Sequence, residues 1–429
     1  MNILLFLIII LAFIVCIGIV NEKLFHIQSD IALLLFSLII SLILLLARDI
    51  IPIQSVKSFI DSLGEFGFEE YLMDGVLCFM LFAGASKVNM RKFRQNLRPI
   101  SLLALLTTLI SSFLYGIIFY GIATIASIPM DIWTCILLGC VVSPTDPIAA
   151  TGILNKIGLS KNVCSVIENE SLFNDGTGVT LFIFVRSIII HSGDSNFVTL
   201  MLKEILGAVV VALVVSWVLF KLVEITHDPI RYILISLLDV SAVYIICEHL
   251  GFSGVIASVV CGMFFSYSMG KIERRVMVID PNEFYHDFWE ILESMLNAVL
   301  FIMIGLLVLD IELSKYVLIL VPASIIIIVL SRAIGVLISS ILTGKNIPGN
   351  YSLPEFVTLM TWSALKGGLS LALAFGTSEY LSHEIYNVFI NVTYVTIFFT
   401  VLVQGLTVKR VYLSLERHKA ARMNKRANV

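Results

Sequence analysis

Long apolar stretches alternate with short polar connections along almost the whole chain. Thirteen such stretches stand out, and each is long enough, at about 20 residues, to cross roughly 30 Å of hydrocarbon as a helix. They cover residues 3–20, 30–47, 71–87, 99–125, 131–154, 163–190, 202–223, 229–249, 253–269, 287–309, 316–342, 355–378 and 385–408. The pattern therefore predicts an all-α polytopic membrane protein with about 13 transmembrane helices.

Composition agrees with this pattern. Of the 429 residues, 59% are hydrophobic and only 14% are charged, whereas a soluble domain averages about 25% charged residues. The seven cysteines are scattered through the predicted spans, without a CxxC or Cys/His pattern. We therefore expect no disulfide framework and no zinc site. We also expect no cofactor and no nucleic-acid partner. The apolar N-terminal stretch lacks the basic start of a signal peptide, so we expect a retained first helix.

Lysine and arginine are distributed unequally between the two sides that these spans define. Of the 28 basic residues, 21 fall in alternate connections and the C-terminal end, four in the other connections and three inside spans. Because cytoplasmic loops are enriched in basic residues, the asymmetry predicts an odd number of spans. The N-terminus is then outside, and residues 409–429 form a short basic cytoplasmic tail.

The fifth span contains a charge between two prolines. Pro144 and Pro147 flank Thr145 and Asp146 in the run SPTDP. Each proline removes a backbone N–H and disfavours helix in the preceding residue. Freed backbone groups at this depth are tolerated beside a polar partner or a water-filled cavity. A simple proline kink is the plainer interpretation, but the carboxylate favours a functional break.

A second interruption is predicted in the twelfth span. Lys366 precedes Gly367 and Gly368 near its centre. A glycine pair weakens a helix, although it also occurs where helices pack closely. A lysine at this depth requires a negative partner or a helix dipole, and it favours a break.

The two interruptions occupy equivalent places if the first six and last six spans are copies. One helix lies between the copies, so the second copy starts on the opposite side of the membrane. We expect repeat one at about 1–190, a linker helix at about 202–223 and repeat two at about 229–408, together a transmembrane domain over 1–408. Broken helices at matching places in inverted repeats indicate the substrate site of a secondary transporter.

The sixth span carries polar residues that could complete such a site. Ser171 and Asp175 are four residues apart and share one helix face. With Asp146 and a freed carbonyl of Thr145, they could form an all-oxygen shell for a hard cation such as Na⁺.

Glu170 and Asn174 form a neighbouring pair on the same helix. We expect Glu170 to pair with Arg332, a buried base in the eleventh span, and to hold helices in place. The alternative for Arg332 is a side chain that reaches the membrane interface.

Two other functions use the same residues. An intramembrane aspartyl protease would need two carboxylates that share a proton, and Asp146 and Asp175 are the candidates. A cation channel is a third possibility, and it would not couple cation flux to a pH gradient.

Five segments of the chain resemble the bacterial sodium/proton antiporters of the NhaP type, which are relatives of animal sodium/hydrogen exchangers. In chain order they read SPTDPIAATGIL, ENESLFNDGTGV, FWEILESMLNAVLFIMIGL, LSRAIGVLI and WSALKGGLSLALA. The resemblance covers essentially the whole membrane region, and the TDP and ESLFND motifs together are highly specific.

The resemblance implies a thirteen-helix fold with six-helix inverted repeats, a homodimer in the inner membrane and alternating access. It implies that Asp175 carries the transported proton or cation, with Asp146, Thr145 and Ser171 at the same Na⁺ site. The substrates would be H⁺ and Na⁺, with Li⁺ or K⁺ as further candidates for the cation.

The resemblance also assigns supporting roles. Glu170 is similar to a glutamate that pairs with an arginine, here Arg332, and Asn174 marks the electroneutral branch. Three positions depart from the family. Asn169 precedes Glu170 where relatives usually carry glycine, and Lys366 stands where an arginine is usual. Ala83 stands where many relatives carry a glutamate, which bears on ion selectivity.

Overall fold

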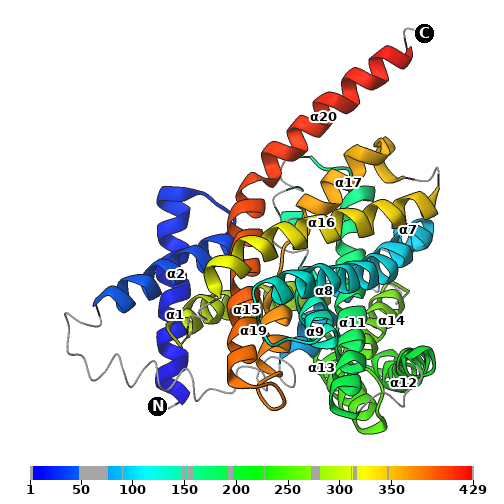
Figure 1. Cartoon of the computed structure of the whole chain (residues 1–429). Coiled ribbons are helices and arrows are strands. Elements are labelled where there is room, and N and C mark those ends of the chain that lie inside the picture. The colour runs from blue at the N-terminus through cyan, green and yellow to red at the C-terminus, as the bar shows by residue number, and fades with distance from the viewer. Residues whose placement is uncertain are drawn as a thin grey trace.

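Helices are the only regular secondary structure of the computed structural model over the residues that it describes (Figure 1). The described residues are 3–47, 76–88, 90–146, 151–152, 154, 158–191, 197–226, 228–271, 281–310, 312, 316–344 and 347–427. Within them, each of the thirteen predicted spans coincides with helix. The predicted all-α architecture is confirmed.

The N-terminal part of the chain supplies the first six spans. Its helices are α1 (Ile3–Val20), η1 (Asn21–Phe25), α2 (Ser29–Ala47), α5 (Leu77–Ser86), α6 (Met90–Gln95), α7 (Leu97–Ser101), η3 (Leu102–Thr107), α8 (Thr108–Ile125), α9 (Ile132–Val142) and α11 (Lys161–His191). Asp131 immediately precedes the short helix α9, and its side chain accepts a hydrogen bond from the backbone N–H of Trp133. This cap satisfies one of the free donors at a helix start.

The C-terminal part begins with the linker helix α12 (Phe197–Ile225). It continues with α13 (Pro229–Leu250), α14 (Gly254–Met269), α15 (Pro281–Leu306), η4 (Leu307–Asp310), α16 (Val317–Thr343), η5 (Pro348–Asn350), α17 (Leu353–Trp362), α18 (Gly368–Phe375), α19 (His383–Phe398), η6 (Phe399–Gln404) and α20 (Gly405–Ala427).

The surface of the bundle is apolar, as a lipid setting requires. Eight helices among the described residues are long and apolar enough to cross a membrane. On α12, an exposed stripe of large apolar side chains recurs every three or four residues. Its members are 57% to 60% exposed and comprise Leu206, Val210, Val214 and Trp217. In water such a stripe would need a cover, whereas in a bilayer it faces acyl chains.

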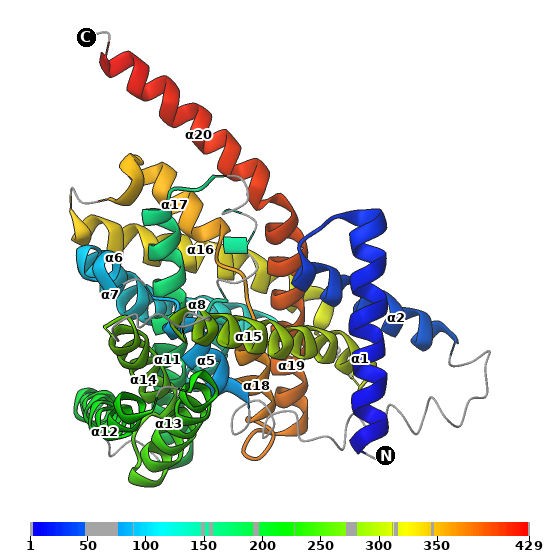
Figure 2. The same ribbon diagram turned by 180° about the vertical axis from the view of Figure 1, so that it is seen from behind.

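The interior of the bundle holds the two interrupted spans. Figures 1 and 2 show α1 and α2 on one side of the molecule and α12 on the other, with α11, α15 and α19 between them. The largest apolar core joins buried side chains of α9, α11, α15, α18 and α19. The helices on either side of both interruptions therefore pack into this core.

The basic C-terminal residues continue the last span as one helix. α20 extends away from the bundle in both views. Arg422 pairs with Glu355 of α17 at 2.9 Å and donates to the carbonyl oxygen of Asn350 at 2.6 Å. Tyr351 donates to Glu416 of α20. The tail is thus attached to the connection between α16 and α17.

Candidate functional site

The interruptions predicted in the fifth and twelfth spans are both present, and they cross each other. α9 stops in mid-span, and residues 363–367 separate α17 from α18. Between these ends, the backbone N–H of Asp146 donates to the carbonyl oxygen of Leu365 at 2.8 Å in a short antiparallel bridge. Pro147 lies outside the described residues, so its part in the first interruption stays a prediction.

Lys366 closes the end of α9 from the opposite segment. Its Nζ donates to the carbonyl oxygens of Ser143 at 2.7 Å and Pro144 at 3.0 Å. The last carbonyl groups of a helix lack partners within the helix and carry partial negative charge. The ammonium group, although 2% exposed, therefore lies against the negative end of a helix dipole.

Asn174 and Ser171 of α11 attach the unwound segment to their helix through Thr145. Asn174 accepts from the Thr145 backbone N–H at 3.1 Å and donates to the Thr145 hydroxyl oxygen at 2.7 Å. The Ser171 hydroxyl donates to the carbonyl oxygen of Thr145 at 2.6 Å. The sequence suggested both oxygens as cation ligands. Here the two oxygen atoms are hydrogen-bonded to each other, and each keeps a lone pair for a cation.

Glu170 and Arg332 meet as a buried bidentate pair. Nη1 and Nη2 of Arg332 each lie 2.9 Å from a carboxylate oxygen of Glu170. The side chains are 2% exposed for Glu170 and 4% for Arg332. Glu170 also accepts from the Asn174 amide at 2.9 Å. The pair joins α11 to α16 beside the crossing.

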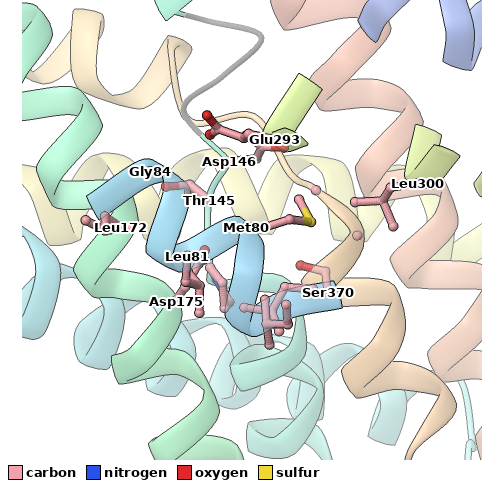
Figure 3. Close-up of a pocket in the computed structure, with 15 residues that line it drawn as sticks. Met80, Leu81, Gly84, Thr145, Asp146, Leu172, Asp175, Glu293, Leu300 and Ser370 are labelled. Carbon is pink, nitrogen blue, oxygen red and sulfur yellow. The ribbon is translucent and has the colours of Figure 1, made fainter. Parts of the chain in front are cut away.

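A cavity of about 80 Å³ lies against the crossed segments. It is lined by carboxyl groups, small residues and apolar side chains of α5, α11, α15 and α18: Leu77, Met80, Leu81, Gly84, Pro144, Thr145, Asp146, Leu172, Asp175, Glu293, Leu300, Gly367, Gly368, Leu369 and Ser370. Figure 3 shows Glu293 and Asp146 toward the top of the view and Asp175 below them. Of the predicted Na⁺ ligands, Asp146, Asp175 and Thr145 line this cavity.

Asp175 presents its carboxylate to the cavity without a protein partner. The residue is partly exposed, and among the described residues no donor has a hydrogen bond to its side chain. The charges that act on it come from Asp146, Glu170 and Lys366. A carboxylate inside a membrane span without a donor is costly, so this group is suited to bind a proton or a cation.

Glu293 of α15 is a cavity residue that the sequence interpretation missed. Its Oε2 lies 2.6 Å from Nζ of Lys87, at the end of α5. A helical spacing could have pointed to it, because Glu293 and Leu300 are seven residues apart and share a face. Leu300 packs against Gly368 of the twelfth span.

Ala83 does not line the cavity. Its side chain is fully buried in a second apolar cluster with Phe82 and Cys78. The next residue of α5, Gly84, faces the cavity instead. In this structure the family departure at Ala83 therefore lies away from Asp146 and Asp175.

Asp239 of α13 is a fully buried aspartate. Its Oδ2 accepts a hydrogen bond from Sγ of Cys261 on α14 at 3.1 Å. It packs with the cluster of α12–α15 and does not line the cavity.

The approach of the two interruptions depends on Gly367. A Cβ atom at this position would lie 2.8 Å from Oδ2 and 2.9 Å from Cβ of Asp146. We expect Gly367→Ala to displace Asp146 and to lower the free energy of unfolding by about 1–3 kcal/mol, as overpacking does. Thermal unfolding of the purified protein would measure it.

Gly121→Ala in α8 is the control, because a Cβ there meets nothing within 4 Å. Alanine in a helix is favoured over glycine by about 0.8–1.0 kcal/mol, so this variant should be as stable as the parent or more so. Equal stability of the two variants would contradict a tight crossing at Gly367.

Comparisons with known proteins agree with this architecture. Residues 9–413 match the family described as "Sodium/hydrogen exchanger, transmembrane". The chain is 31% identical to the Na⁺/H⁺ antiporter NhaP of Pseudomonas aeruginosa, over 94% of this chain and 96% of that protein. It is 29% identical to the Na⁺/H⁺ antiporter NhaH of Halobacillus aidingensis, over 73% of this chain and 75% of that protein.

A solved structure has the same fold. The sodium proton antiporter MjNhaP1 from Methanocaldococcus jannaschii superposes with a TM-score of 0.74 at 20% identity, covering 96% of this chain and 97% of that one. The family match spans nearly all of the membrane region, including both interrupted spans and the cavity between them. The chain is a multi-pass membrane protein that belongs to the sodium/hydrogen exchanger family.

Proposed function

We propose that this protein exchanges H⁺ for Na⁺ across the membrane, one for one, with both ions competing for Asp175. The observation that carries the proposal is a cavity at two crossed, unwound segments, into which Asp175 projects a carboxylate with no hydrogen-bond donor among the described residues. The relatives named as Na⁺/H⁺ antiporters support the choice of ions.

Competition for one carboxylate is sufficient to couple the two fluxes. Asp175 is neutralised by a proton or by a cation, but not by both at once. Asp146 and Thr145 line the same cavity, and hard cations prefer oxygen ligands. Because an uncompensated charge is costly in the membrane, the carrier moves between its two orientations only when Asp175 is occupied.

Hydrogen bonds link the segments around the site, so that they would move together as a rigid body. Thr145 is bound to α11, Lys366 to the end of α9, and Glu170 to α16. Reorientation of this rigid body against the rest of the bundle would expose Asp175 to one side at a time. We propose that the chain is organised as inverted repeats at about 1–190 and 229–408, linked by α12.

The proposed setting is a homodimer in the inner membrane, with the N-terminus outside and the tail in the cytoplasm. The excess of basic residues on one side supports this orientation. Lys87, which is 44% exposed beside the cavity residue Glu293, belongs to the predicted cytoplasmic side. The cavity is then the inward-facing entry to Asp175.

Purified protein in liposomes with an internal pH dye tests the exchange. Imposed inward Na⁺ gradients should move protons outward, and Li⁺ and K⁺ series would give the selectivity. A one-for-one cycle moves no net charge, so a 100 mV potential, about 2.3 kcal/mol per charge, should leave the rate unchanged. A rate that follows voltage would contradict electroneutrality, and no pH change with any cation would contradict exchange.

The protease alternative is not supported. The matched relatives are named as antiporters or exchangers, so the protein is not assigned an enzymatic reaction. A channel would conduct Na⁺ without a dependence on the pH gradient, which the same liposome assay separates from exchange.

A further inference from the structure

We infer that Glu293 captures Na⁺ at the entry of the cavity and sets the apparent affinity for the ion before it reaches Asp175. The inference rests on the proposed exchange function and adds a residue to it. Glu293 belongs to α15, outside the crossed segments that carry Asp146 and Lys366.

Glu293 connects the cavity with a cation at the surface. Its side chain lines the same cavity as Asp146 and Asp175 (Figure 3), and it is 8% exposed. Nζ of Lys87 lies 2.6 Å from its Oε2, and the lysine side chain is 44% exposed. The counter-ion of this enclosed carboxylate is therefore one that remains in contact with solvent.

A lysine is a counter-ion that can be exchanged. Its ammonium is a compact, strongly hydrated charge on a flexible stem, so Lys87 can return to water while its helix stays in place. Na⁺ can then take its position, because hard cations bind carboxylate oxygens. The cavity of about 80 Å³ exceeds the roughly 30 Å³ that one water occupies in the liquid.

The surroundings of Glu293 favour a cation and leave it room. Asp30 at the start of α2 is 9% exposed and adds a negative charge that acts on Glu293. Clustered charge of one sign raises the local concentration of counter-ions. Gly84 leaves the path open, because a Cβ there would lie 3.9 Å from Oε1 of Glu293 and 3.5 Å from Cδ1 of Leu172.

Na⁺-driven pH change in liposomes, measured over a Na⁺ series, tests the inference through KM and maximal rate. We expect Glu293→Gln to raise KM for Na⁺ by about three- to tenfold, the effect of one charge interaction that solvent largely screens. The maximal rate should stay close to that of the parent. Glu283→Gln is the matched control, because Glu283 lies on the same helix, is exposed and does not line the cavity.

A substitution of Lys87 should change KM for Na⁺ in the opposite direction. Lys87→Gln frees Glu293 of its counter-ion, so KM for Na⁺ should fall. In the double variant KM should equal that of Glu293→Gln alone, because Lys87 acts through Glu293. If Glu293→Gln does not insert stably, Glu293→Asp and Lys87→Gln still carry the test, since the aspartate should keep KM near the parent value.

The outcomes separate this inference from the exchange function. An unchanged KM in Glu293→Gln, or a KM that rises in Lys87→Gln, would overturn the role of Glu293 and leave exchange intact. A parent protein that moves no protons with Na⁺ would overturn both. A loss of maximal rate in Glu293→Gln at constant KM would show a structural role only, and it also contradicts the inference.

Discussion

Asp175→Asn should abolish Na⁺-driven proton movement in liposomes. Asparagine keeps the shape of the side chain but cannot carry the negative charge that a proton or a cation neutralises. Without that charge neither ion can be held at the site and exchanged for the other, so we expect at least about a 100-fold loss of rate. The initial rate of the internal pH change, at saturating Na⁺, measures it.

Asp239→Asn is the control for this experiment. Asp239 is a buried intramembrane aspartate too, but it contacts Cys261 and does not line the cavity. The control should retain Na⁺-driven pH change within a few-fold of the parent. Retained exchange in Asp175→Asn, with both variants equally incorporated, would remove Asp175 from the mechanism.

The positions of the helices were predictable because membrane spans have a simple requirement. A span must be apolar for about 20 residues. A charged or helix-breaking residue inside a span is energetically costly, and such a residue is easily recognised in the sequence. The interruption at Lys366 and the pairing of Glu170 with Arg332 could both be expected from such costs. Each charged group required a partner, and few partners were available at that depth.

Rotation of the helices about their axes was less predictable. A span buried on all sides or facing lipid is apolar all around, so its sequence does not show which face meets a cavity. Ala83 and Gly84 are neighbours on α5, about 100° apart around the helix, and only Gly84 faces the cavity. Glu293 was missed because its position in the sequence, near the start of a span, does not distinguish a cavity residue from one at the membrane interface.

The hydrogen bonds within the site could not be predicted from the sequence either. Ser171 and Thr145 have oxygen atoms suited to a cation, but hydroxyl groups can equally bind each other. The structure has them paired, with Asp175 accessible beside them. Residue types define what a site can bind, whereas the conformation decides which ligands are available.

Arg332→Met should cause the largest loss of stability among single changes around the site. It leaves the Glu170 carboxylate enclosed, with the Asn174 amide as its remaining side-chain donor among the described residues. Breaking a buried pair in this way costs about 3–5 kcal/mol. We expect the unfolding temperature in detergent to fall by on the order of 5 °C or more.

Arg186→Met on the same helix as Glu170 is the matched control. Arg186 is 40% exposed and lies 3.5 Å from Glu379, which is 76% exposed, and exposed pairs contribute about 0–1 kcal/mol. Its unfolding temperature should match that of the parent. Glu170→Gln combined with Arg332→Met should recover part of the loss, because no unpaired charge remains. If Arg332→Met and Arg186→Met unfold at the same temperature, the buried pair does not hold α11 to α16.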